Sequence, residues 1–139
     1  MNDAESIIAA LDLKPHPEGG WYAETHHISS PQGQRSPGTA IYYLLKAGER
    51  SGWHRIDATE TWHFYAGDPI ELSLSFGHGC KRLVLGPDII AGHRPQVVVA
   101  PGEWQAAISA GAWSLAGCTV SPGFDFSGFE LAPANWRPA

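Results

Sequence analysis

The segment from Ile70 to Phe76 carries the clearest structural signal in the chain. Apolar and polar residues alternate strictly along it, in the order IELSLSF. This period of two predicts a β-strand with one buried face and one face toward water. Glycine (16 residues) and proline (11 residues) are abundant, which favours many short strands joined by turns over a helical bundle.

Further short runs rich in β-branched and aromatic residues predict additional strands between turn signals. These strands are expected over residues 21–28, 39–45, 83–85, 97–99, 104–108 and 113–120. One amphipathic helix is expected over residues 3–11, with Asn2 or Asp3 as its cap. The sequence therefore predicts an all-β jelly roll or barrel with a short N-terminal helix.

Composition narrows the class of protein. The 139 residues predict a single domain over 1–139, with 43% hydrophobic and 17% charged residues. The formal charge is −5 and the nine basic residues are scattered, which argues against a nucleic-acid partner. The chain shows no secretion signal and no apolar run of membrane-spanning length, and Cys80 and Cys118 are expected to be free thiols. We therefore expect a cytoplasmic protein that does not enter a membrane.

A second pattern, G-x5-H-x-I-x3-E-x6-G, runs from Gly48 to Gly67. His54 and Ile56 are two residues apart, so on a strand they share one face, and Glu60 and Trp62 have the same parity. A histidine and a glutamate facing inward would form a polar spot in an apolar cavity. We therefore consider His54 and Glu60 as catalytic candidates, with His54 as a base and Glu60 as its partner. The alternative is a hydrogen-bonded core histidine and an ion-paired edge glutamate.

This spacing resembles the first motif of the cupin superfamily, G-x5-H-x-H-x3-4-E-x6-G, with isoleucine at the second histidine. The segment VVVAPGEWQAA resembles the second motif, P-x-G-x2-H, with Gln105 at the histidine position. The segments PHPEGGWYAET, HRIDATETWHFYAGDPIEL and VSPGFDFSGFELA resemble a small single-domain cupin subfamily of unassigned function, itself similar to deoxyhexose (dTDP-sugar) epimerases. The resemblance implies a double-stranded β-helix, a homodimer and an epimerase-like pocket inside the barrel.

The resemblance also places the metal ligands of typical cupins at positions 54, 56, 60 and 105. Ile56 cannot bind a metal, and Gln105 offers only an amide oxygen. A catalytic zinc site uses three good ligands, and non-haem iron uses two histidines and a carboxylate. We therefore expect neither a tightly bound metal nor another cofactor.

Four further residues are candidates for contact with a small-molecule ligand: Glu24, Tyr43, Trp62 and Gln105. Glu24 could instead be a surface carboxylate, and core packing is the alternative for Tyr43. His63 has the opposite parity to Glu60 and is expected outside the barrel. The phenylalanines at 124, 126 and 129 are expected to form a packed C-terminal cap.

Three functions fit these features, and the sequence leaves open whether the protein is an enzyme. The first is a metal-independent isomerase or epimerase acting on a sugar-like or carbonyl substrate, since His54 and Glu60 could remove a proton next to a carbonyl. The second is a non-catalytic binding protein for a small apolar or aromatic ligand. The third is a residual metal-dependent oxygenase or lyase.

Overall fold

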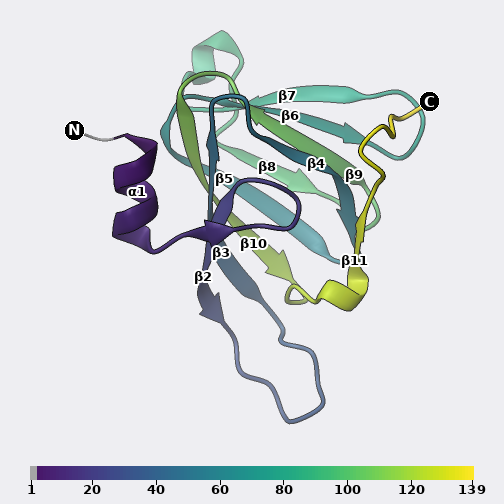
Figure 1. The fold of residues 1–139 in the computed structure, drawn as a ribbon. Helices are drawn as coiled ribbons and strands as arrows, with labels where there is room; N and C mark the ends of the chain where they lie inside the picture. Colours follow the sequence, from purple (N-terminus) through teal and green to yellow (C-terminus); the bar gives the residue numbers. More distant parts are fainter. Residues whose placement is uncertain (1–2) are drawn as a thin grey trace.

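The computed structural model describes residues 3–139 (Figure 1). Its one α-helix, α1 (Ala4–Leu11), begins where the sequence predicts, and the side chain of Asp3 caps it by accepting a hydrogen bond from the Ser6 amide at 2.8 Å. Asn2, the other candidate cap, lies outside the described residues. The apolar side of α1 packs with Leu44 and Leu115 on the outside of one β-sheet.

The strands form two sheets, and neighbouring strands pair antiparallel throughout. The six-stranded sheet contains, in spatial order, β1 (Lys14–Pro15), β2 (Trp21–His27), β3 (Thr39–Lys46), β10 (Trp113–Ser121), β5 (Thr59–Gly67) and β8 (Gln96–Val99). The five-stranded sheet contains β11 (Phe129–Leu131), β4 (Arg50–Ile56), β9 (Trp104–Ser109), β6 (Ile70–Ser75) and β7 (Lys81–Leu85). Two short 3-10 helices, η1 (Ile89–Ala91) and η2 (Phe126–Gly128), complete the elements. The predicted jelly roll with a short N-terminal helix is confirmed.

The hydrophobic core lies between the two sheets. Leu45 and Trp62 contribute from the six-stranded sheet, and Ile70 and Leu72 contribute from β6. The predicted alternation therefore holds from Ile70 to Leu74, but its extension to Phe76 is wrong, because Ser75 is buried and the Phe76 side chain is 66% exposed. The strand ends at Ser75, whose hydroxyl accepts from the Gly77 amide and donates to the Gly79 carbonyl, so the chain turns away before position 76.

A register shift interrupts the pairing of β4 with β9 between Ser51 and His54. Such a bulge turns the strand, so that Ser51 and His54 are both buried although they are three residues apart. His54 and Ile56 share the inner face, as do Glu60 and Trp62 on β5, which confirms the parity argument. Within residues 3–139, no helix has the length and apolar character needed to cross a membrane.

Candidate functional site

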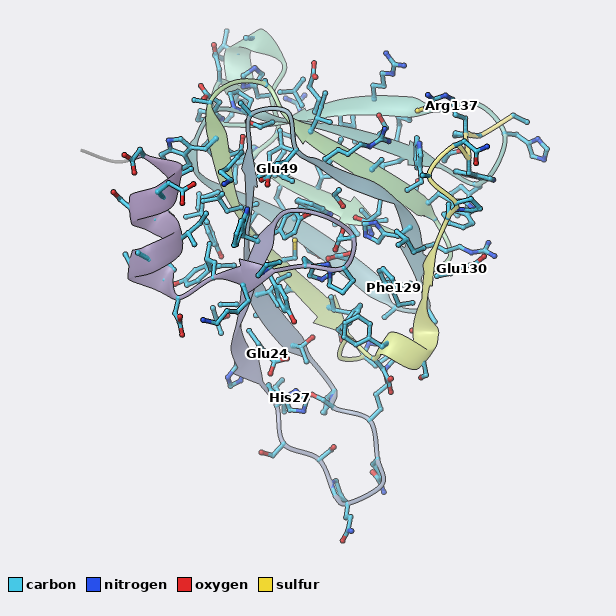
Figure 2. The ribbon with its side chains drawn as sticks, viewed as in Figure 1. Glu24, His27, Glu49, Phe129, Glu130 and Arg137 are labelled. Carbon is cyan, nitrogen blue, oxygen red and sulfur yellow. The ribbon has the colours of Figure 1, made fainter. Side chains whose placement is uncertain are left out.

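A cavity of about 240 Å³ lies at one end of the barrel, between the ends of both sheets. We call it the barrel pocket; its lining includes Glu18, Glu24, His54, Glu60, Cys118 and Phe129. Glu24 and Phe129 come from opposite ends of the chain and mark two sides of this region (Figure 2). The pocket therefore has a polar wall of carboxyl groups and two histidines, His16 and His54, and an apolar wall of aromatic rings.

The orientation of His54 is fixed by two contacts. Its Nδ1 lies 2.7 Å from the Gly52 carbonyl oxygen, and its Nε2 lies 3.1 Å from Oε2 of Glu18. A carbonyl oxygen can only accept, so Nδ1 carries a hydrogen and donates it. In a neutral ring Nε2 is then the acceptor. His54, only 2% exposed, therefore presents a proton acceptor to the Glu18 carboxyl group.

Glu18 reaches this position from the turn between β1 and β2. Two adjacent glycines shape the turn, with φ of 108° at Gly19 and 79° at Gly20, and the Tyr43 hydroxyl donates to the Gly19 carbonyl. A side chain at Gly20 would collide with that hydroxyl, since an added Cβ would lie 2.7 Å from it. The turn is therefore held against β3, and it directs Glu18 into the barrel.

Burial favours the uncharged forms of the groups around Glu18. It raises the pKa of Glu18 to about 8, against an opposing hydrogen bond from the Ser51 hydroxyl. Burial also lowers the pKa of His54, and it lowers the pKa of His16, whose Nδ1 lies 3.3 Å from Glu18, to about 4. At neutral pH Glu18 and His54 thus share one proton, carried by the carboxyl group and directed at Nε2.

Glu60 has a different partner from the one expected. The sequence spacing suggested His54, but Oε1 of Glu60 accepts from Nε2 of Gln105 at 2.8 Å, and Oε1 of Gln105 accepts from the Trp62 indole at 2.8 Å. His54 does not meet this carboxyl group because its two ring nitrogens are already engaged by Gly52 and Glu18. His54 and Glu60 both line the pocket, and burial raises the pKa of Glu60, with the Glu18 charge as the second cause.

Three of the four predicted ligand contacts lie behind the pocket instead of on its lining. Tyr43, Trp62 and Gln105 are almost completely buried. Tyr43 holds the turn that carries Glu18, Gln105 bonds Glu60, and Trp62 holds Gln105. Glu24 does line the pocket, with a side chain that is 51% exposed and lies 3.7 Å from Nδ1 of His27. His63 lies outside the barrel, as expected, with its Nε2 at 3.2 Å from the Thr119 hydroxyl.

The apolar wall consists of Phe124, Phe126 and Phe129, whose rings meet edge to face at centroid distances of 4.7–5.9 Å. They form the expected C-terminal cluster, and they also line the pocket. Arg35 holds this segment in place: its Nε donates to the Gly123 carbonyl, and its two Nη atoms form a bidentate ion pair with Asp57 at 2.7 and 3.0 Å. These contacts anchor the C-terminal segment that carries the apolar wall to the rest of the protein.

The donor set does not fit the metal of typical cupins. The carbonyl oxygen of Gln105 already accepts from Trp62, its amide nitrogen donates to Glu60, and Ile56 presents only hydrocarbon. Over residues 3–139, no three histidine, cysteine, aspartate or glutamate side chains are grouped as metal ligands.

Sequence reasoning missed Glu18, Ser51 and His16 as site residues. The segment PHPEGGWYAET contributed only to the family resemblance, although a histidine and a glutamate two residues apart precede its paired glycines. Ser51 could not be found from parity, because the bulge in β4 changes which face it occupies.

The family model described as "Cupin superfamily (DUF985)" matches residues 5–132, and the chain belongs to this family. A Shewanella oneidensis protein of known structure is 37% identical, with a TM-score of 0.90, over 95% of this chain and 85% of that one. A hypothetical protein from Leishmania major is 32% identical, with a TM-score of 0.83, over 94% and 88% of the two chains.

A dTDP sugar isomerase from Desulfovibrio desulfuricans G20 is 15% identical, with a TM-score of 0.61, over 88% of each chain. At this identity the likeness shows the fold alone. No curated protein matches the chain.

Proposed function

We propose that the barrel pocket catalyses proton transfer on a small carbonyl or sugar-like compound, as a metal-independent isomerase or epimerase. The observation that carries this proposal is the contact between Nε2 of His54 and Oε2 of Glu18 at 3.1 Å, because it keeps a transferable proton at the pocket wall. General acid–base catalysis requires groups that exchange protons near the working pH, and the pKa of Glu18 is raised to about 8.

The geometry favours different roles from those expected from the sequence. Both ring nitrogens of His54 are engaged, by Gly52 and by Glu18, so His54 offers the substrate no free nitrogen that could act as a base. We assign the base to Glu60, whose carboxylate uses one oxygen for Gln105 and whose raised pKa makes it a stronger base. Glu60 would take a proton from the carbon next to the carbonyl. The Glu18–His54 pair would give a proton to the carbonyl oxygen, which forms an enol or enediol. As the first proton returns to the neighbouring carbon in an isomerisation, or to the opposite face of the same carbon in an epimerisation, the pair would take a proton back from the oxygen, so no net proton is gained or lost.

The charges of the lining indicate the substrate class. Among residues 3–139, the lining of the pocket has three glutamates, Glu18, Glu24 and Glu60, and neither lysine nor arginine. A dTDP sugar carries a diphosphate, and this lining offers it no cation, so we propose a free and uncharged substrate. The volume of about 240 Å³ lies below the roughly 300–1,000 Å³ of ligand pockets in general, which also favours a small molecule.

Hydrogen–deuterium exchange tests the proposal without knowledge of the product. Uncharged sugars and small carbonyl compounds would be incubated with the protein in D₂O, and deuterium at the carbon next to the carbonyl would be followed by NMR. We expect exchange with the wild type, loss in Glu60→Gln and Glu18→Gln, and no change in Glu130→Gln, a matched control that pairs with Arg55 on the surface. Exchange that persists in both pocket variants would reject the proposal.

The second candidate is a binding protein for an apolar or aromatic ligand, which the three-phenylalanine wall favours. Saturable binding without deuterium exchange, weakened by Phe126→Ala and unaffected by Glu60→Gln, would identify this function. A metal-dependent oxygenase or lyase would instead require stoichiometric metal by elemental analysis of the purified protein.

We also propose a homodimer. Val98, on the free edge of the six-stranded sheet, is 57% exposed, and an exposed apolar edge strand is typical of a contact surface. Sedimentation velocity should give about twice the chain mass of 15.0 kDa; a species of single-chain mass at micromolar concentration would contradict it.

A further inference from the structure

A groove of about 370 Å³ crosses the outer face of the five-stranded sheet, on the side away from the core. Its floor is made by Ser73 and Ala106, which lie opposite each other in the β6–β9 pairing. Two small side chains in the middle of a sheet face, surrounded by larger ones, leave a hollow. The groove is therefore built by the sheet itself.

Three arginines converge on this groove from separate parts of the chain. Arg50 begins β4, Arg82 lies in β7 opposite Ser73, and Arg137 belongs to the C-terminal tail. Glu71 is the only acidic residue in the described lining. The groove thus gathers three of the chain's nine basic residues, although the whole chain has a formal charge of −5.

The position of Arg137 is fixed by contacts on both sides of it. The Trp136 ring packs on Trp104 at 4.6 Å and on Trp53 at 5.7 Å between centroids. After Arg137, the backbone of Ala139 bonds to Gly77 at 3.0 Å and to Gly79 at 2.8 Å. The tail therefore lies along the sheet beside the β6–β7 hairpin, where Figure 2 shows Arg137.

The three groove arginines differ from Arg35 and Arg55, which form ion pairs with carboxylates. Arg35 pairs with Asp57, and Arg55 pairs with Glu130. Within residues 3–139, neither Arg50, Arg82 nor Arg137 lies at ion-pair distance from a carboxylate. Three guanidinium groups held around one hollow repel one another, and an anion bound between them would relieve that repulsion.

We propose that this groove binds a small ligand that carries phosphoryl groups. The guanidinium fork matches the paired oxygens of a phosphoryl group, and three forks around one hollow favour a group with more than one negative charge. The volume falls within the range of small-molecule sites. This site is separate from the barrel pocket, and the inference does not depend on the proposed isomerase activity.

Isothermal titration calorimetry with inorganic pyrophosphate at low ionic strength tests the site. We expect saturable binding, weaker binding of inorganic phosphate, and weaker binding of citrate, which carries comparable charge on carboxylates. Arg82→Gln and Arg137→Gln should each weaken pyrophosphate binding about tenfold, the scale of one lost charge-assisted hydrogen bond. Glu71→Gln should strengthen it, since it removes the negative charge of the lining.

Two controls make the result specific. Arg94→Gln alters an exposed arginine outside the groove that donates to the His93 carbonyl, and Glu18→Gln alters the barrel pocket; both should bind pyrophosphate as the wild type does. Absence of saturable binding, equal weakening by Arg94→Gln, or tighter binding of citrate than of pyrophosphate would overturn the proposal. Sedimentation velocity provides one more test. If the groove variants dissociated an oligomer while pyrophosphate failed to bind, the groove would be a contact between subunits and the proposal would be overturned.

Discussion

The barrel pocket and the outer groove share a five-stranded sheet but have opposite chemistry. The pocket receives His54 and Ile56 from β4, together with carboxyl groups from the first turn and from β5. The groove receives Arg50 from the same strand, with Arg82 and Arg137. Regular alternation would place Arg50 and His54, four residues apart, on the same face, but the bulge between Ser51 and His54 changes the parity. One strand can therefore serve an acidic interior site and a basic exterior one.

The two sites also differ in how far water stabilises the charged forms of their side chains. Burial makes charge costly in the pocket, so it raises the pKa values of Glu18 and Glu60 and lowers the pKa of His54. Arg50 and Arg82 are exposed and remain solvated. The pocket is therefore suited to moving protons, and the groove is suited to holding a permanent negative charge.

The largest expected effect separates the two sites by activity. Glu60→Gln should lower the rate of deuterium exchange by about 10²–10⁴-fold, the usual contribution of a general acid or base. Arg82→Gln should leave this rate unchanged, because its side chain lies on the other face of the sheet. NMR exchange rates for the two purified variants measure the difference, and equal losses in both would show that the sites are not independent.

A second prediction concerns the polar chain behind the pocket. Gln105→Leu leaves the Trp62 indole and the Glu60 carboxyl group without their partner. We expect it to lower the free energy of unfolding by roughly 2–4 kcal/mol, since an unpaired buried polar group costs about 1–3 kcal/mol. Chemical denaturation measures the loss. Gln96→Leu, at an exposed position of β8, is the matched control and should change stability by less than about 0.5 kcal/mol.

A third prediction uses the pKa of Glu18, raised from 4.5 to about 8. Between these values the folded protein holds a proton that the unfolded chain releases, so stability falls as pH rises. His16, whose pKa is lowered from 6.5 to about 4, acts in the opposite direction, but only below its unfolded value. From pH 6.5 to 8 the free energy of unfolding should therefore fall by about 1–2 kcal/mol.

Denaturation at several pH values measures this slope. Glu18→Gln should flatten it, because the amide does not titrate, whereas Glu130→Gln on the surface should leave it unchanged. A slope that persists in Glu18→Gln would assign the proton to another group.

The smallest expected effect concerns the ion pair that holds the aromatic wall. Arg35→Gln removes a bidentate but largely exposed contact with Asp57, so it should cost less than about 1 kcal/mol of unfolding free energy. Its main consequence should be greater mobility of the segment that carries Phe124, seen as faster amide hydrogen exchange. Unchanged exchange there would show that the phenylalanine cluster holds itself in place.

The fold could be predicted from the sequence to a large extent. Alternation along Ile70–Ser75 and the turn residues gave the strands, and the spacing around His54 gave the family and one end of the pocket. The site was predicted only in part. His54, Glu60 and Glu24 do line the pocket, whereas His54 pairs with Glu18 in place of Glu60, because the first turn brings Glu18 to Nε2 of His54.

By itself, the sequence determined the local properties of this protein: which residues alternate, where the turns fall, and which ligand of the family motif is replaced at Ile56. These properties depend only on which residues are close to one another in the sequence. Only the tertiary structure decided that Glu18 meets His54, that Gln105 joins Trp62 to Glu60, and that three distant arginines share one groove. The physical reason is that such contacts depend on sheet order, on one bulge in β4 and on the path of the C-terminal tail, none of which is encoded by local spacing.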